Sequence, residues 1–229
     1  METGIEASSP ESLAAAELLI FDLDGTLIDS QRDLVESVNA TRGHMGMAPL
    51  ETAVIASYVG NGAPVLIARS LGAEAGEREV ARGLEYFLGY YREHMLDHTD
   101  LYPGVREALD RLREAGRAMA VLTNKPVRFS QEIVEGLGLT GHFLRVYGGN
   151  SFEHKKPHPV GIERLMAEAG SAASRTVMVG DSAVDIRTAR AAGVFACGVT
   201  FGFQPETFVD APPDLLVDDL RDLARWVIG

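Results

Sequence analysis

Short apolar runs alternate with amphipathic helical patterns along most of the chain, and this alternation constrains the fold more than any other feature. The runs are short and largely continuous, as expected for strands that are covered on both faces. The apolar runs occupy residues 18–21, 118–122, 144–147, 176–179, 194–199 and 215–217, and the helical patterns occupy 105–115, 129–137, 160–169, 184–191 and 220–227. Strand and helix in turn are typical of right-handed βαβ units. The sequence therefore predicts an α/β fold built on a parallel sheet.

The segment 31–100 interrupts this alternation, because it contains several helical patterns and no convincing β run. Its apolar residues, such as Leu34 and Val38, recur three or four positions apart, which is typical of helices that pack on a core. We interpret the segment as an inserted helical cap. Two linkers join it to a core of residues 17–30 and 101–229. We expect these linkers to act as a hinge between the cap and the core. Residues 1–16 carry acids and no Lys or Arg, and we expect a flexible tail there.

Charge and cysteine content exclude several classes of protein. The chain has 229 residues, with 21 Lys and Arg against 33 Asp and Glu, a formal net charge of −12. No basic run exceeds the pair Lys155-Lys156, so we expect no nucleic-acid partner and no membrane partner. The one cysteine, Cys197, cannot form an internal disulfide. No apolar stretch approaches the ~20 residues of a membrane span, and the first residues lack a leader pattern, so we expect a cytoplasmic protein.

Two carboxylates, Asp22 and Asp24, follow the first apolar run directly, at the edge where parallel sheets bind ligands. Residues two apart on extended backbone point the same way, so both acids can face one reacting group. Asp-Gly is also a common turn, and two solvated acids in a turn are the plain alternative. The full string D-x-D-G-T arises by chance in about one chain of this length in a thousand, which favours function.

Two further polar groups follow the sheet in chain order. Thr123 and Asn124 come directly after the run 118–122, and both side chains can bond phosphate oxygens. Taken alone, a threonine and an asparagine after a strand more often form a turn or a helix N-cap. In Lys155-Lys156-Pro157-His158-Pro159 the prolines stiffen the backbone, so that a lysine can offset charge on a phosphoryl group. The alternative is a solvated lysine pair before a helix.

Asp181 and Asp185 complete the set after the run 176–179. Helix capping explains Asp181 if it is considered by itself. However, carboxylate oxygens suit Mg²⁺, and all four groups of polar residues fall at the carboxyl ends of predicted strands. Acids, a hydroxyl and a cation together are the parts of a phosphoryl-transfer site.

The strings FDLDGTLIDS, VLTNKP, KKPHP and VGDSAVD resemble, in this order, the four motifs of the haloacid dehalogenase superfamily, over 18 to the C-terminus. Within it the chain is most similar to phosphoglycolate phosphatases, through YVGNGAPVLIARSLG, LTNKPVRF, KPHP and GDSAVDIRTARAAG. The resemblance implies a Rossmann-like parallel sheet core with an inserted α-helical cap.

The resemblance also implies roles for the site residues. Asp22 would be the nucleophile that becomes an aspartyl phosphate, and Asp24 the acid that protonates the leaving oxygen and then activates water. Thr123 and Lys156 would hold the phosphoryl group. Lys156 is chosen over Lys155 because it directly precedes Pro-x-Pro, as in the family pattern.

Mg²⁺ would be bound by the Asp22 carboxylate, the Asp24 carbonyl and Asp181, with Asp185 as a further acid. A dianionic phosphate would be repelled by Asp22 without such neutralisation, so we expect metal dependence. Dehalogenases of the superfamily lack the second acid of the first motif, so Asp24 points away from dehalogenation.

Substrate choice is expected in the cap, because a helical lid over the site contacts the leaving group. The resemblance implies that the loop around Asn61 faces the active site. Arg69 is a candidate partner for a small substrate carboxylate, and a plain surface position is its alternative.

We therefore predict a Mg²⁺-dependent phosphomonoesterase for a small phosphorylated metabolite, with 2-phosphoglycolate as the leading substrate and a monomer or homodimer as the assembly. A pyrophosphatase, a nucleotidase and a sugar-phosphate phosphatase or mutase remain alternatives, since they share the core residues. An inactive phosphate-binding module and a structural dimer formed through the cap are the alternatives outside catalysis.

Overall fold

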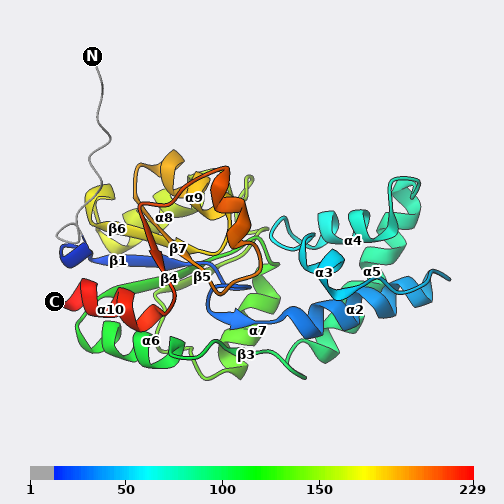
Figure 1. Ribbon diagram of the computed structural model, residues 1–229, viewed down its shortest axis with the longest axis horizontal. Helices are drawn as coiled ribbons and strands as arrows, with labels where there is room; N and C mark the ends of the chain where they lie inside the picture. Colours follow the sequence, from blue (N-terminus) through cyan, green and yellow to red (C-terminus); the bar gives the residue numbers. More distant parts are fainter. Residues whose placement is uncertain (1–12) are drawn as a thin grey trace, which may run out of the picture.

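The computed structural model describes residues 13–229 and contains a six-stranded sheet in the order β5-β4-β1-β6-β7-β8 (Figure 1). Every neighbouring pair in the sheet is parallel. The strands are β1 (Leu18–Phe21), β4 (Ala118–Leu122), β5 (Arg145–Tyr147), β6 (Thr176–Gly180), β7 (Phe195–Val199) and β8 (Leu215–Val217). All four residues of β1 are buried, and so are all five of β6. The predicted α/β class with a parallel sheet is confirmed.

Helices cover both faces of the sheet, because alternate strand residues point to opposite sides. The side chains of Leu19 and Phe21 lie in one core cluster with residues of α6 (Val105–Glu114), α7 (Val127–Gly136) and α10 (Leu220–Ile228). Leu18 and Ile20 lie in a second cluster with residues of α8 (Val160–Ala169) and α9 (Ala183–Ala192). Short 3-10 turns occur at Ala173–Arg175 and Pro205–Val209.

The cap is a group of helices beside the sheet domain, drawn in blue to green at the right of Figure 1. It contains α2 (Gln31–His44), α3 (Thr52–Ala56), α4 (Ala63–Leu71) and α5 (Glu77–His94). Val38, Ile67 and Phe87 are fully or almost fully buried, so the apolar stripes of these helices form the cap's interior. The cap therefore has packing of its own while remaining part of the larger core cluster.

The two linkers to the cap form a small sheet that the sequence analysis did not predict. β2 (Ile28–Asp29) pairs antiparallel with β3 (Asp100–Leu101), so the outgoing and returning chains are bonded to each other. Asp33 adds a second link, because its Oδ2 accepts hydrogen bonds from the backbone N–H groups of His98 and Thr99. Strands of two residues carry too little pattern to be read from sequence.

The start of the described chain differs from the prediction of a flexible tail over 1–16. Leu13 and Ala16 are each 1% exposed and belong to the core cluster that contains residues of α6, α7 and α10. The packed chain thus begins before residue 17, while residues 1–12 of the predicted tail lie outside the described part. Within residues 13–229, no helix has the length and apolar character that crossing a membrane would demand.

Candidate active site

Three neighbouring strands deliver polar side chains to one edge of the sheet. β1 lies between β4 and β6, and the residues that follow these strands are Asp22, Thr123 and Asp181. All three are less than 10% exposed. The carboxyl ends of parallel strands are the usual ligand site of an α/β sheet, and the polar ends here are buried under the cap. The local sequence, an apolar run that ends in a polar residue, explains each placement.

Three carboxylates and one lysine form the centre of this site. Oxygens of Asp22, Asp181 and Asp185 lie within 4.8 Å of one another, and all three residues are buried. Lys156 Nζ is 2.9 Å from Asp22 Oδ1 and 2.6 Å from Asp185 Oδ1. Ser182 donates from both its backbone N–H and its hydroxyl to Asp185 Oδ2, within the capping box at the start of α9. Asp185 thus anchors Lys156 against Asp22.

Crowding of buried charge perturbs these groups. Burial raises the pKa of Asp22 to about 6, against the opposing effect of Lys156 and with a further rise from Asp185. Burial, Asp185 and Asp22 raise the pKa of Asp181 well above its ordinary range. Burial alone would lower the pKa of Lys156, but Asp185 and Asp22 outweigh it and raise the value. The lysine is therefore charged, and one positive charge faces three acids.

The donor set fits a small divalent cation. Three buried carboxylates around the single charge of Lys156 leave an excess of negative charge when all three are ionised. Burial is the main cause of the raised pKa values of Asp22 and Asp181, and the neighbouring acids add to the rise. Hard oxygen ligands of this kind suit Mg²⁺. The backbone passes very close to the carboxylate trio of Asp22, Asp181 and Asp185. A Cβ on Gly25, whose φ is +80°, would lie 2.2 Å from Asp181 Oδ2. Glycine is thus required there for both the turn and the space beside the acid.

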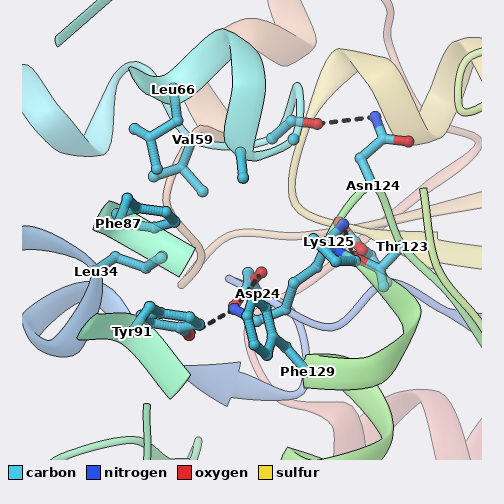
Figure 2. A pocket seen from close by; sticks show the side chains of 15 residues that line it. Asp24, Leu34, Val59, Leu66, Phe87, Tyr91, Thr123, Asn124, Lys125 and Phe129 are labelled. Carbon is cyan, nitrogen blue, oxygen red and sulfur yellow. Dashed lines mark hydrogen bonds and ion pairs between the residues drawn. The ribbon is translucent and has the colours of Figure 1, made fainter. Parts of the chain in front are cut away.

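Asp24 is held apart from the trio by a different set of partners. Its Oδ1 accepts a hydrogen bond of 2.5 Å from the Ser30 hydroxyl, and Lys125 Nζ lies 2.8 Å from Oδ1 and 3.1 Å from Oδ2. Lys125 Nζ also donates to the Tyr91 hydroxyl at 2.6 Å, so a cap helix is bonded to the acid through this lysine (Figure 2). Burial raises the pKa of Tyr91 to about 12, more than Lys125 lowers it, so the phenol keeps its proton.

A cavity that is partly open to solvent lies between the cap and these acids. Asp22, Asp24, Thr123, Asn124 and Lys125 line it from the core, and Figure 2 shows apolar side chains of the cap on the side opposite Thr123 and Lys125. The apolar lining residues include Leu34, Val59, Leu66, Phe87 and Phe129. The combination of an apolar wall and a few convergent polar groups is typical of a small-ligand site.

Polar side chains of the core hold the cap against this cavity. Asn124 Nδ2 donates to the Gly60 carbonyl at 2.9 Å (Figure 2). Lys155 Nζ donates to the Asn61 carbonyl at 2.7 Å. Gln204 Nε2 lies within hydrogen-bond distance of three carbonyls of the segment 56–59, the shortest contact being 2.9 Å to Val59. The cap is therefore in a closed arrangement.

Comparison with known proteins agrees with this geometry. Residues 19–199 match the family model described as haloacid dehalogenase-like hydrolase. The chain belongs to the haloacid dehalogenase-like hydrolases. It is 38% identical to a phosphoglycolate phosphatase of Chromobacterium violaceum, over 93% of this chain and 96% of that protein. It is 40% identical to a phosphoglycolate phosphatase of Vibrio parahaemolyticus, over 92% and 96% of the two chains.

A solved structure extends the likeness to three dimensions. The crystal structure of a predicted phosphoglycolate phosphatase from Haemophilus somnus superposes with a TM-score of 0.87 at 32% identity. The match covers 92% of this chain and 97% of that one. The predicted haloacid dehalogenase-like core with its inserted helical cap is thereby confirmed, and the chain is a hydrolase of this family.

Most residues singled out from the sequence meet at this site of the hydrolase fold. Asp22, Asp24 and Thr123 line the cavity, while Asp181, Asp185 and Lys156 lie around Asp22. The Thr123 hydroxyl accepts only the Lys125 backbone N–H, which leaves its own proton to donate. Asn124 also lines the cavity, but its amide N–H groups donate to the Gly60 and Lys156 carbonyls. These two bonds tie the cap loop to the segment of Lys156 and occupy the donors that the sequence analysis expected to bind phosphate.

The two site residues predicted in the cap, Asn61 and Arg69, differ in their position relative to the cavity. Asn61 belongs to a loop whose flanking glycines, Gly60 and Gly62, line the cavity, and its own carbonyl faces Lys155. Arg69 is exposed on α4 and is not among the residues that line the cavity. The buried face of α4 carries Leu66, with Ile67 and Ser70, so helical phase turns Arg69 outward. The expected pairing of Arg69 with a substrate carboxylate has no support in this arrangement.

Two functional residues were missed in the sequence analysis. Lys125 directly follows the Thr-Asn pair, but its partner Tyr91 lies 34 residues away on α5, where the apolar period indicates only core packing. The available signal was Lys125 itself, a charged residue within the string VLTNKP at a strand end. A second signal was a tyrosine, which when buried usually requires a hydrogen-bond partner.

Proposed function

We propose that this hydrolase is a Mg²⁺-dependent phosphatase that cleaves small phosphomonoesters through an aspartyl phosphate on Asp22, with 2-phosphoglycolate as the substrate. The observation that carries the proposal is the convergence of Asp22, Asp181 and Asp185 around Lys156, directly below a cavity that contains Asp24. This arrangement supplies a nucleophile, a cation site, a fixed positive charge and a separate acid.

Asp22 is the nucleophile because it is the one acid of the trio that lines the cavity. One carboxylate oxygen is occupied by the Leu23 backbone N–H at 2.7 Å and by Lys156, which fixes the side chain and leaves the other oxygen for attack. That oxygen forms a bond to phosphorus while the bond from phosphorus to the leaving oxygen breaks. Attack requires the ionised form, so Lys156 opposes the burial that raises the Asp22 pKa.

Asp24 is the acid and then the base. In the first step its proton passes to the leaving oxygen, which departs as an alcohol. In the second step the ionised Asp24 takes a proton from water, whose oxygen attacks phosphorus and releases phosphate from Asp22. Ser30 and Lys125 hold the Asp24 carboxyl at the cavity. The separation of Asp24 from the trio suits this division of roles between two acids of one motif.

Mg²⁺ would be held by carboxylate oxygens of Asp22 and Asp181 and by the Asp24 backbone carbonyl. Asp185 would support the site from behind, because both of its oxygens already bond Lys156 or Ser182. When bound, the cation offsets the charge of the phosphate and of its attacking carboxylate. Thr123 and Lys156 would complete the binding of the phosphoryl oxygens.

The choice of 2-phosphoglycolate is supported by the relatives and by the cavity. Curated relatives of 37–40% identity are named phosphoglycolate phosphatases. The walls above Asp24 are made of side chains such as Leu66 and Phe87, which offer no partners to the hydroxyl groups of a sugar. A leaving group of few atoms suits this space.

Phosphate release from a substrate panel tests the proposal. The panel contains 2-phosphoglycolate, pyrophosphate, nucleoside monophosphates and sugar phosphates, each with Mg²⁺ and with EDTA, for the wild type and Asp22→Asn. We expect preference for 2-phosphoglycolate, loss of activity in EDTA, and no turnover by Asp22→Asn although it remains folded by circular dichroism. Mass spectrometry after a rapid acid quench should find phosphate on the peptide that contains Asp22. Turnover by Asp22→Asn would refute the mechanism, and preference for another ester would refute the substrate.

A further inference from the structure

The cavity between cap and sheet contains one basic side chain. Of its lining residues, Asp22 and Asp24 are acids and Lys125 is the only base. The Lys125 side chain is 5% exposed, so its charge sits in a largely water-excluded place. A charge in such surroundings interacts more strongly with a nearby anion than it would in water. The mechanism above uses Lys125 only to hold Asp24.

We propose that Lys125 Nζ and the Tyr91 hydroxyl form a subsite for a carboxylate on the leaving group, which selects small phosphorylated hydroxy acids over neutral phosphate esters. This inference rests on the proposed function. It assigns the substrate selectivity of the enzyme to Lys125 of the core and Tyr91 of the cap.

Both groups have donors to spare. An ammonium carries three N–H donors, and Lys125 Nζ contacts both carboxylate oxygens of Asp24 and the Tyr91 oxygen. One N–H shared between the two Asp24 oxygens and one directed at Tyr91 leave the third for a ligand. Tyr91 accepts the bond from Lys125, so its own proton is left to donate, and its pKa of about 12 keeps the proton in place. One N–H and one O–H can therefore bond the same carboxylate. Such charge-assisted pairs are the stronger kind of hydrogen bond.

The position of Lys125 matches a carboxylate very close to the ester bond. Asp24 must come within about 2.8 Å of the leaving oxygen in order to protonate it. Lys125 Nζ is 2.8 Å from Asp24 Oδ1, so the ammonium lies within about 6 Å of that oxygen. In glycolate a single carbon separates the oxygen from the carboxylate, which falls inside this range. A carboxylate on a long chain would be carried past it.

The surroundings favour an anion and disfavour a polyol. Gly62 and Ala63, at the start of the nine-residue helix α4, also line the cavity, so the positive end of that helix faces the same space. Phe129 and Phe87 cover the remaining wall, and Phe129 stacks edge to face on Tyr91 and fixes its ring. Hydroxyl groups buried against these rings would lose their bonds to water without replacement.

Paired substrates separate a carboxylate subsite from a general role of Lys125. 2-Phosphoglycolate and 2-hydroxyethyl phosphate have the same chain length and differ in the carboxylate. The quantity measured is the ratio of kcat/KM for the two substrates with Mg²⁺. Lys125→Met should lower both values, because Asp24 loses a partner, and should reduce the ratio by about 10- to 100-fold. Tyr91→Phe, which removes one hydroxyl and keeps the ring, should reduce the ratio by about 3- to 10-fold.

Arg128→Met is the matched control, since Arg128 is an exposed cation of α7 that pairs with Glu132 and does not line the cavity. Its ratio should equal that of the wild type. Equal losses on both substrates in Lys125→Met and Tyr91→Phe would overturn the subsite and leave Lys125 as a positioning residue for Asp24. If Arg69→Ala alone lowered the ratio of the two kcat/KM values, the substrate carboxylate would be assigned to the exposed arginine instead.

Binding to Asp22→Asn separates failure of this inference from failure of the proposed function. Calorimetry with Mg²⁺ compares the affinities of the two esters without turnover, in Asp22→Asn and in the double variant with Tyr91→Phe. Tighter binding of 2-phosphoglycolate that Tyr91→Phe weakens supports the subsite even if the wild type releases no phosphate. Equal affinity for both esters overturns the subsite even if the wild type proves to be an efficient phosphatase.

Discussion

Replacing Asp22 with asparagine should abolish turnover and, in metal-free protein, increase the free energy of unfolding at about pH 7.5. The reason is the raised pKa, 3.8 in an ordinary aspartate and about 6 here. Because folding raises this pKa, the folded form binds the proton more tightly than the unfolded chain. That contribution to stability is fully present below pH 3.8 and is lost as the pH rises through 6.

The size of the effect follows from the difference between the two pKa values. The shift from 3.8 to about 6 corresponds to at most about 3 kcal/mol, at about 1.4 kcal/mol for each pH unit. Asparagine resembles the protonated acid and avoids this cost, and Lys156 keeps Asp185 as a partner. For a chain of this size, the increase is roughly 6–12 °C in Tm as an upper limit.

The assay is urea unfolding in EDTA, followed by circular dichroism, at about pH 7.5 and about pH 4. Asp22→Asn should be the more stable protein at the higher pH, and the gap should shrink at the lower pH. Asp210→Asn, which neutralises an exposed acid, is the matched control and should change stability by no more than about 0.5 kcal/mol. Excess Mg²⁺ should stabilise the wild type more than Asp22→Asn. An Asp22→Asn protein that is less stable than the wild type in EDTA at the higher pH would refute the argument that burial of the ionised Asp22 carboxylate costs stability.

Three further outcomes are expected. Gly25→Ala should cost about 1–3 kcal/mol of stability and weaken Mg²⁺ binding measured by calorimetry, because its Cβ would strike Asp181. Gly46→Ala, with a similar φ of +75° and open space around it, should lose stability without any change in Mg²⁺ affinity. Asp24→Asn should lower kcat about 10²- to 10⁴-fold in steady-state assays, and an unchanged kcat would remove it as the acid. Gln204→Ala should raise KM a few-fold and give a larger radius of gyration by X-ray scattering, since the cap loses its bonds to that amide; an unchanged scattering profile would count against a hinged cap.

The core of the site could be predicted from the sequence because its geometry follows from strand order. Each of the residues Asp22, Thr123 and Asp181 follows an apolar run that is long enough to be read as a strand. Parallel strands then bring their carboxyl ends to one edge whatever the connections between them contain. The linker strands β2 and β3 escaped prediction, because two residues each cannot show a period.

The cap could be predicted only in outline, because its contribution to the site depends on contacts across long sequence separations. Helical periodicity identifies Phe87 and Tyr91 as inward residues of α5, but it does not distinguish a position in the cap interior from one that reaches the active site. Arg69 shows the opposite case. Its charge suggests a ligand for an anion, whereas the phase of α4 buries Leu66 and Ile67 and leaves the arginine in solvent.

The core and the cap contribute different groups to the site. Asp22 and Lys156 are held by the buried sheet edge and by Asp185, so the proposed chemistry takes place on residues of the core. Tyr91 belongs to the cap, and its bond to Lys125 exists only while the cap is closed on the core. Lys125 in turn contacts Asp24. In the proposed mechanism, one ammonium therefore takes part in cap closure, in recognition of the leaving group and in placement of the acid. A substrate that does not keep the cap closed would therefore lose both the contact with Lys125 and Tyr91 and the correct placement of Asp24. For such a substrate kcat and affinity should fall together.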